Sequence, residues 1–314
     1  MLTTVALTGA SGFIGGVIAQ HLKKAGWHVR GLARSPRQVQ KLENLGIEPV
    51  LCQLENPASL LALVKESFAV IHCAGAIRGI SREDFYPTNV MGVSNIIQAC
   101  LADSSLPRFV LLSSLAAREP SLSPYAWSKH EGEAVLTREA GALKWSIFRP
   151  PAVYGPQDRA LLPLFTMLRK GIGIQLGPSQ AKFSLIHVDD LANAILHWLK
   201  SGDPPSQTFE IDDGFPGGYS WEDVFRIANP RLHLCLRIPS SLLKIGGKSS
   251  EIFSHLLRYT PLFTSGKVAE LLHLNWVCDN THVTQTLGWT PQISLKEGLR
   301  RLFTSDSLMP SHRD

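Results

Sequence analysis

The stretch Val5-Ala6-Leu7-Thr8-Gly9-Ala10-Ser11-Gly12-Phe13-Ile14-Gly15 joins a short apolar run to a segment of helical length. Gly9 tolerates a tight turn, Gly12 lets the backbone approach a pyrophosphate, and Gly15 permits close packing of helix on strand. An anion would lie on the N-terminus of the helix. The stretch predicts a dinucleotide-binding turn, with a purely structural strand–helix turn as the alternative. The expected cofactor contacts are Gly9, Gly12, Phe13, Ile14 and Gly15.

Around this turn, short apolar runs alternate with amphipathic stretches throughout the first half of the chain. The runs are nearly continuous in apolar residues, as expected for strands covered on both faces. The expected strands are Val5–Leu7, Val29–Leu32, Pro49–Leu51, Val70–Cys73, Phe109–Leu112 and Ser146–Phe148. The expected helices are Gly15–Lys24, Val39–Leu45, Ala58–Lys65, Val90–Cys100 and Tyr125–Glu139. This alternation predicts an α/β fold with a Rossmann-type, doubly wound parallel sheet.

The strand–helix rhythm breaks after Arg149, where proline and glycine become frequent. We expect residues 1–150 to form a dinucleotide-binding domain, to which a strand–helix unit at 183–200 returns. Residues 151–182 and 201–304 are expected to form a smaller C-terminal substrate lobe, and 305–314 a frayed tail. The Leu- and Ile-rich stretches Leu232–Ile245 and Ile252–Leu262 would line an apolar pocket or serve as core helices.

The composition of the 314 residues excludes several classes of protein. The 31 Lys and Arg against 26 Asp and Glu are spread along the chain, which disfavours nucleic-acid binding. The sequence shows no leader peptide and no apolar stretch long enough to span a membrane. Five cysteines without a Cys-x-x-Cys pair favour a reducing, cytoplasmic location. Histidine spacing gives no support for a metal site.

The end of the second expected strand bears on the choice between NAD and NADP. An acidic residue there would accept a hydrogen bond from the ribose 2′-hydroxyl, but no acid occurs between Arg30 and Glu43. A basic corner suits a 2′-phosphate, because guanidinium pairs with phosphate through two hydrogen bonds. We therefore expect NADP to be preferred, with NAD as the second choice, held by Arg34 with Ser35 and Arg37. A solvated basic loop is the alternative.

Three further residues have the spacing of a proton-transfer site. Ser114 closes the fifth expected strand, and Tyr125 and Lys129 share one face of the next helix at positions i and i+4. A lysine ammonium near a phenol lowers the phenol's pKa from about 10, and a hydroxyl can polarise a carbonyl. Ser114, Tyr125 and Lys129 are the expected catalytic residues. A surface helix pair is the alternative for the Tyr-x-x-x-Lys spacing alone.

These motifs together resemble the extended short-chain dehydrogenase/reductase family, also called NAD-dependent epimerase/dehydratase. The resemblance covers almost the whole chain and implies further cofactor contacts from Leu54, Ala74, Gly75, Pro150 and Val153. A homodimer through helices 90–100 and 125–139 is open. The segments that carry the resemblance are Thr8–Gly15, Val70–Gly75, Asn89–Gly92, Ser114 with Tyr125 and Lys129, Arg149–Pro156, His187–Ala192 and Leu287–Pro291.

Some residues in these segments also have plain structural interpretations. We expect His72 to be a packed strand residue. Asp189 and Asp190 are expected to cap and orient the helix that follows them. Asn89 either supports the active site or simply satisfies backbone groups.

Three departures from the family pattern bear on the substrate. Leu115 and Ala116 stand where 4,6-dehydratases carry acids, Ala152 stands where many sugar-nucleotide enzymes carry asparagine, and the segment around Arg118-Glu119 is short. The resemblance therefore favours the branch with 3β-hydroxysteroid dehydrogenase-like and dihydroflavonol reductase-like enzymes. It implies an NADP(H)-dependent oxidoreductase that interconverts a carbonyl and a secondary alcohol on a small, fairly apolar substrate. A nucleotide-sugar epimerase and a non-catalytic cofactor-binding subunit are the alternatives.

Overall fold

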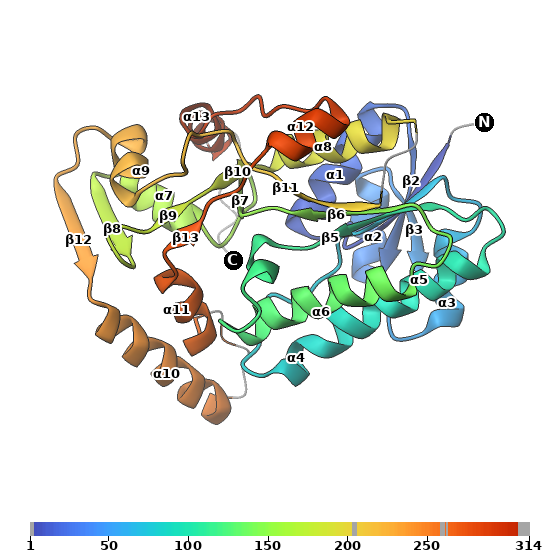
Figure 1. Ribbon diagram of the computed structural model, residues 1–314, viewed down its shortest axis with the longest axis horizontal. Helices are drawn as coiled ribbons and strands as arrows, with labels where there is room; N and C mark the ends of the chain where they lie inside the picture. The colour runs from blue at the N-terminus through green and yellow to red at the C-terminus, as the bar shows by residue number, and fades with distance from the viewer. Residues whose placement is uncertain (1–2, 203–205, 258–260, 262, 307–314) are drawn as a thin grey trace.

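The computed structural model describes residues 3–202, 206–257, 261 and 263–306. In this part of the chain a seven-stranded parallel sheet forms the centre of the molecule, in the order β11-β6-β5-β4-β1-β2-β3, with helices on both faces (Figure 1). Its strands are β1 Thr4–Thr8, β2 His28–Ala33, β3 Glu48–Leu51, β4 Ala69–His72, β5 Arg108–Leu112, β6 Trp145–Arg149 and β11 Gln207–Glu210. Its helices are α1 Phe13–Lys24, α2 Pro36–Asn44, α3 Pro57–Val64, α4 Arg82–Tyr86, α5 Gly92–Ala102, α6 Pro124–Glu139 and α8 Val188–Lys200. The predicted doubly wound parallel sheet is confirmed.

Helices α2, α3 and α6 begin in the same way, with a polar cap followed by proline. The side chains of Ser35, Asn56 and Ser123 each accept a hydrogen bond from a backbone N–H in the first turn. The proline that follows has no N–H to leave unpaired at the first helical position. The helix expected at Val90–Cys100 differs, because it is preceded by a π-helical turn at Pro87–Met91.

The two faces of the sheet bury separate apolar clusters, because successive strand residues point to opposite sides. Val5 and Leu7 of β1 lie in the cluster under α1 and α8, whereas Ala6 lies in the cluster under α3, α5 and α6. In β5, Val110 and Phe109 divide in the same way. Strand burial on both faces explains the nearly continuous apolar runs in the sequence.

The second half of the chain forms smaller units at one end of the sheet (Figure 1). Apart from β11, its strands pair in twos within the described residues, β7 with β10, β8 with β12 and β9 with β13. The strands are β7 Ala152–Tyr154, β8 Ile172–Leu176, β9 Lys182–Phe183, β10 Leu185–His187, β12 Leu234–Ile238 and β13 Asn275–Trp276. The helices are α7 Leu162–Arg169, α9 Trp221–Ala228, α10 Ser240–Leu257, α11 Ser265–Leu272, α12 Thr281–Leu287 and α13 Leu295–Asp306.

The expected division of the chain into domains stays a prediction, but two placements bear on it. Helix α8, from the expected returning unit, packs against α1. Strand β11 lies within 201–304, yet it pairs with β6 at the edge of the central sheet. In the expected tail, residues 305–306 belong to α13, and 307–314 lie outside the described residues. No helix in the described part of the chain is both long enough and apolar enough to cross a bilayer.

The expected core role of Leu232–Ile245 is wrong for much of that stretch, whereas the alternative of a pocket lining stays a prediction. Leu234 and Leu236 lie on strand β12, which pairs with β8 in a two-stranded sheet within the described residues, and their side chains are exposed. Leu242 and Ile245 of α10 are exposed as well, so neither pair lines a core. The expected stretch Ile252–Leu262 lies partly outside the described residues.

Candidate active site

The turn between β1 and α1 is built around the absence of side chains. Gly9 has φ +73°, and a Cβ there would lie 2.9 Å from backbone atoms of Cys73 and Ala74. A Cβ on Gly15 would collide with the carbonyl oxygen of Gly9. Gly12 caps α1 without a side chain, so no side-chain cap covers the first N–H groups of the helix. The turn therefore offers the anion-binding cradle that the sequence predicts.

Thr8 ties the end of β1 to the end of β4, a role that the sequence reasoning did not assign. Its hydroxyl accepts a hydrogen bond from the Ala74 N–H (3.0 Å) and pairs with Nδ1 of His72 (3.0 Å). Burial, with the Lys129 ammonium nearby, lowers the pKa of His72 to about 3, so the ring is neutral at ordinary pH. His72 is 1% exposed and is a packed strand residue as expected.

The basic corner after β2 is exposed and carries unpaired guanidinium groups. Ser35 caps α2, and the Arg34 backbone N–H donates to Gln38 Oε1 (2.7 Å). Within the described residues, the side chains of Arg34 and Arg37 have no ion-pair partner. Lys41 reaches back from α2 and donates to the Ser11 carbonyl of the glycine turn (2.7 Å). The corner is thus electropositive and free to contact an anionic group.

Ser114 and Tyr125 lie beside each other just beyond the carboxyl end of β5, where the serine hydroxyl affects the pKa of the phenol. Ser114 begins a 3-10 turn and accepts the Ala116 N–H (3.2 Å), which fixes the position of its hydroxyl. Phe85 packs edge-on against Tyr125, with ring centroids 5.9 Å apart. Burial raises the pKa of Tyr125 to about 12, the Ser114 hydrogen bond opposes this rise and the Glu270 carboxylate adds to it. The phenol is therefore protonated at neutral pH and can act as an acid.

Lys129 lies one helical turn beyond Tyr125 and donates to the Leu112 carbonyl (2.9 Å). Its Nζ would be 3.5 Å from a Cβ built on Gly75, so the ammonium lies beside the segment after β4. Burial lowers the pKa of Lys129 to about 8, against the opposing charges of Glu133 and Cys73. The expectation that Lys129 lowers the Tyr125 pKa is wrong for the protein alone, because burial of the phenol dominates.

Asn89 in the π-helical turn connects the two halves of the candidate site. Its Nδ2 donates to the Ala76 carbonyl (3.0 Å) and to Ser128 Oγ (2.8 Å), and its Oδ1 accepts the Ala76 N–H (2.7 Å). Asn89 therefore satisfies backbone groups, one of its two expected roles, and fixes the segment after Gly75 against α6.

The remaining expected cofactor contacts differ in accessibility. Leu54 is buried in the core beside α5, where its carbonyl accepts from Asn95 (2.7 Å). Pro150 is buried and its carbonyl accepts the Leu115 N–H (2.9 Å). Val153 is half-buried in β7, and Ala74 lies against Gly9.

A carboxylate from the C-terminal lobe reaches the start of α6, and no pattern in the sequence indicated this contact. Ser123, the cap of α6, donates to Glu270 Oε1 (2.5 Å), and Lys267 pairs with Glu270 Oε2 (2.9 Å). Glu270 is 7% exposed and influences Tyr125, although 147 residues separate it from Ser123. Only the folded chain brings these residues together.

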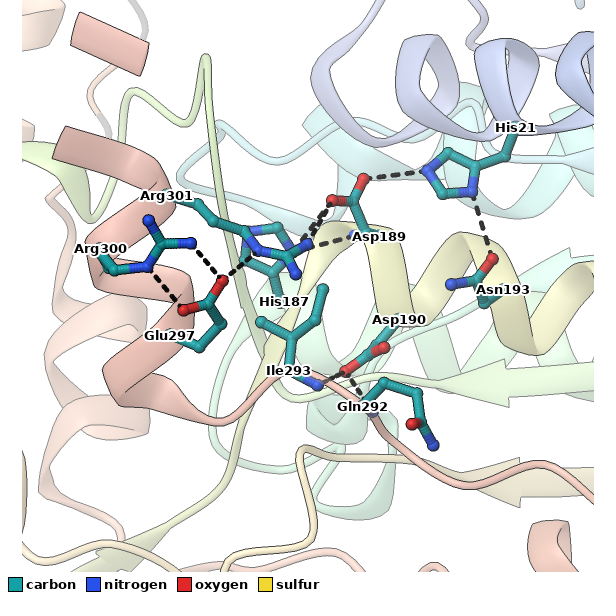
Figure 2. Close-up of polar contacts among 10 residues, drawn as sticks. All are labelled: His21, His187, Asp189, Asp190, Asn193, Gln292, Ile293, Glu297, Arg300 and Arg301. Atoms are coloured by element: carbon teal, nitrogen blue, oxygen red, sulfur yellow. Dashed lines mark hydrogen bonds and ion pairs between the residues drawn. The ribbon is translucent and has the colours of Figure 1, made fainter. Parts of the chain in front are cut away.

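Asp189 and Asp190 connect α8 to elements that are distant in the sequence (Figure 2). Asp189 accepts from His21 of α1 (2.9 Å), which lowers the Asp189 pKa. Asp190 accepts the N–H groups of Gln292 and Ile293 (3.0 and 2.8 Å). The expected cap is wrong in detail, because the cap of α8 is His187, whose Nδ1 accepts the Asp189 N–H (3.3 Å).

No group of three or more possible metal ligands among His, Cys, Asp and Glu occurs in the part of the chain that the structure describes. The candidate site consists of three parts that the fold brings to one edge of the sheet: the glycine turn, the basic corner after β2, and the group Ser114, Tyr125 and Lys129.

Comparison with known proteins agrees with this arrangement. Residues 5–211 match the model of the NAD dependent epimerase/dehydratase family. A ceramide reductase of Caulobacter vibrioides is 35% identical over 279 residues, covering 87% of this chain and 85% of that protein. A UDP-glucose 4-epimerase of Vibrio cholerae is 26% identical, covering 96% of this chain and 94% of that protein.

A solved structure of a putative epimerase from Burkholderia cenocepacia is also similar, with a TM-score of 0.75 at 19% identity over 98% of this chain and 99% of that chain. At this level of identity the similarity shows a shared fold only. The family match over residues 5–211 and the 35% identity to the ceramide reductase show which family the chain belongs to. The chain belongs to the NAD-dependent epimerase/dehydratase family of extended short-chain dehydrogenases/reductases and is an NAD(P)-dependent oxidoreductase.

Proposed function

We propose that this enzyme uses NADPH to reduce a ketone on an apolar, lipid-like substrate, and that the reverse reaction oxidises the corresponding secondary alcohol. The observation that carries the proposal is the position of Lys129, whose Nζ lies beside Gly75, one helical turn beyond Tyr125, and the phenol of Tyr125 in turn lies beside Ser114. The same segment after β4 abuts Gly9 of the glycine turn. A dinucleotide on that turn would thus extend toward the phenol.

The residues around the turn fit a dinucleotide. The uncovered start of α1 suits a pyrophosphate, and the close approaches at Gly9 and Gly15 explain why side chains are absent there. Gly75 leaves room beside Lys129, and Pro150 and Val153 would border the nicotinamide. The bound cofactor supplies the hydride. All other steps fall to side chains of the protein.

Three side chains divide the proton chemistry. Ser114 donates a hydrogen bond to the substrate oxygen and polarises the carbonyl. Tyr125, protonated at neutral pH, transfers its proton to that oxygen as charge develops there. Lys129 orients the cofactor ribose, and its ammonium favours the phenolate that remains. The positions of Tyr125 beside Ser114 and of Lys129 one turn further along α6 support this division of roles.

The preference for NADP rests on Arg34, Ser35 and Arg37. No carboxylate occurs between Arg30 and Glu43, and the guanidinium groups of Arg34 and Arg37 have no acidic partner among the described residues. A 2′-phosphate would pair with Arg34 through charge-assisted hydrogen bonds. The backbone of Ser35, at the start of α2, lies at the same corner.

An apolar substrate is supported by the residues around the site and by similarity. Leu115 and Ala116 follow the catalytic serine, and Ala152 is exposed at the start of β7. None of these can hold the polar groups of a sugar nucleotide. The similar ceramide reductase acts, by its name, on a lipid.

Two further parts of the proposal concern the assembly and the compartment. A homodimer would use α5 and α6, and light scattering of the purified protein tests it. A reducing, cytoplasmic compartment is supported by free cysteines at positions 52, 73, 100, 235 and 278.

A nucleotide-sugar epimerase is the second candidate, because a UDP-glucose 4-epimerase is similar over 96% of the chain. One assay distinguishes the two. The purified protein is given NADPH with a panel of long-chain ketones in detergent and, separately, UDP-glucose with NAD. We expect one oxidised cofactor for each alcohol formed. UDP-galactose formed without net change in cofactor absorbance would overturn the proposal, as would failure of either dinucleotide to bind.

A further inference from the structure

Helix α10 of the C-terminal lobe presents large apolar side chains to solvent. Leu242, Ile245, Ile252 and Phe253 are 57%, 61%, 66% and 56% exposed. At 100° per residue these positions fall on one side of the helix. A monomeric protein rarely leaves such a stripe uncovered on a single helix, so the stripe indicates an interaction surface.

The opposite side of α10 already has its partner within the protein. Leu243 is buried, and a Cβ on Gly247 would lie 3.1 Å from the backbone of Thr264. Glu251 accepts hydrogen bonds from the Ser265 N–H (2.6 Å) and Ser265 Oγ (2.9 Å) at the start of α11. The exposed stripe is therefore a second apolar face, beyond what packing in the lobe requires.

Basic side chains border the exposed stripe. Lys244 and Lys248 are exposed and lie between the two apolar faces, and Arg237 precedes the helix. Within the described residues these three have no ion-pair partner. Residues 231–257 contain a single acid, Glu251, and it is turned toward α11. The surface around the stripe is consequently cationic.

Strand β12 extends the apolar surface along the same rim of the molecule. It leads through Pro239 directly into α10 (Figure 1). Leu234 and Leu236, at alternating positions and therefore on one face of the strand, are 48% and 41% exposed. Two consecutive elements thus expose apolar side chains beside unpaired cations.

We propose that α10 and β12 form a membrane-docking surface, which lies flat on a phospholipid bilayer with anionic headgroups. Apolar side chains would enter the boundary of the acyl chains while Lys244, Lys248 and Arg237 contact headgroup phosphates. A second copy of the chain fits less well, because a two-fold dimer pairs this surface with itself, and its single acid, Glu251, is turned toward α11 and leaves the cations without partners.

The docking surface lies close to the candidate active site. Helix α10 packs on α11, and Glu270 of α11 binds Ser123 at the start of the helix that carries Tyr125. A lipid substrate could pass from the bilayer to the site over a short path. The docking inference does not rest on the proposed reaction, since binding to vesicles is measured without turnover.

Co-sedimentation with vesicles tests the docking surface. We expect the protein to pellet with vesicles of phosphatidylcholine and phosphatidylglycerol, less with phosphatidylcholine alone, and less at high salt. The double variant Leu242→Glu/Ile245→Glu and the charge reversal Lys244→Glu/Lys248→Glu should each weaken binding by about tenfold or more. Leu61→Glu, at an exposed apolar position on α3, is the matched control and should bind as the parent does.

Two results would overturn the docking surface. One is a parent protein that stays in the supernatant with anionic vesicles; the other is unchanged binding by both α10 variants. Light scattering is run in parallel: if the α10 variants turn a dimer into a monomer and vesicles are not bound, the surface joins copies of the chain. Circular dichroism and NADPH binding confirm that each variant is folded.

Discussion

The dinucleotide half and the C-terminal lobe are both built from parallel strands and helices, but different forces define them. The first half is one continuous sheet whose strands are buried on both faces. The lobe consists of strand pairs around a separate apolar cluster that includes Tyr154, Phe165 and Leu185, with polar contacts such as Asn280 to Asp212 (2.7 Å) between segments far apart in the chain. Local apolar pattern indicates the strands of the first region, whereas the lobe depends on contacts between residues that are distant in the sequence.

The difference is also one of chemistry. In the first half, close backbone approaches at Gly9 and Gly15 shape the site. In the lobe, burial disfavours the charged form of carboxyl groups. It raises the pKa of Asp213 to about 7. The stability of the first region should therefore fall when a side chain is enlarged in its close-packed turn. The stability of the lobe should depend on whether its buried carboxyl groups are protonated. The predictions below test this contrast.

The largest effect is expected for Tyr125→Phe, which removes the proposed acid and keeps the ring. We expect kcat to fall roughly 10²–10⁴-fold with NADPH binding unchanged. Steady-state kinetics and cofactor titration measure the two quantities. Tyr86→Phe, at an exposed tyrosine stacked on Trp127, is the control. Activity that survives Tyr125→Phe would remove the proposed mechanism while leaving the fold assignment intact.

Arg34→Ala tests whether the basic corner selects the cofactor. Loss of a charge-assisted hydrogen bond should weaken NADPH by about 1.5–3 kcal/mol and leave NADH nearly unchanged. Lys24→Ala, at the far end of α1, should affect neither cofactor. Calorimetric titration with both dinucleotides gives the answer. Equal losses for the two cofactors would mean that the corner is only a solvated loop.

Gly15→Ala tests whether adding one methyl group in the close-packed turn of the first half lowers the stability of the protein. The added methyl group collides with the Gly9 carbonyl, so we expect a loss of about 1–3 kcal/mol in the free energy of unfolding and weaker dinucleotide binding. Gly202→Ala, where nothing lies within 4 Å of the added atom, is the control. Chemical denaturation that finds both variants equally stable would contradict the close packing of the turn.

Asp213→Asn tests the lobe through its pH dependence. Since the pKa of Asp213 is about 7 when folded and 3.8 ordinarily, the folded protein holds a proton there that the unfolded chain releases. The resulting stability is complete below about pH 4 and is lost as the pH rises through 7. Asn cannot titrate, so stability should change less between pH 5 and 8, by roughly 2–3 kcal/mol.

Thermal melts across this pH range provide the measurement for Asp213→Asn. Asp279→Asn is the control, because hydrogen bonds with Thr281 lower the pKa of that exposed acid. If Asp213→Asn and the parent lose stability in parallel, the group does not titrate in this range.

The sequence alone was enough for six of the seven strands of the central sheet, but not for the edge strand β11. Apolar runs such as Phe109–Leu112 had the length and composition of buried strands, and the glycine spacing could be interpreted through backbone sterics. Ser114 and Tyr125 lie on consecutive elements, so strand–helix order alone brings them near each other.

The lobe could not be predicted in the same way. Strand β12 was expected to belong to a pocket or core, because its leucines indicate burial unless the edge position is known. Glu270 gave no signal, since its role depends on a contact with Ser123 across the whole fold. The pKa of Tyr125 was expected to fall, because the sequence shows the nearby lysine but not the burial of the phenol.

The position of β11 affects how the chain is made. Its only partner in the sheet is β6, which precedes it by more than fifty residues. During synthesis, six strands can assemble on the ribosome while the outer edge of β6 has no neighbour. An open strand edge is a template for pairing with other chains, so nascent protein is exposed to aggregation until Gln207–Glu210 emerges. Chaperone demand should therefore be greatest in this interval of translation.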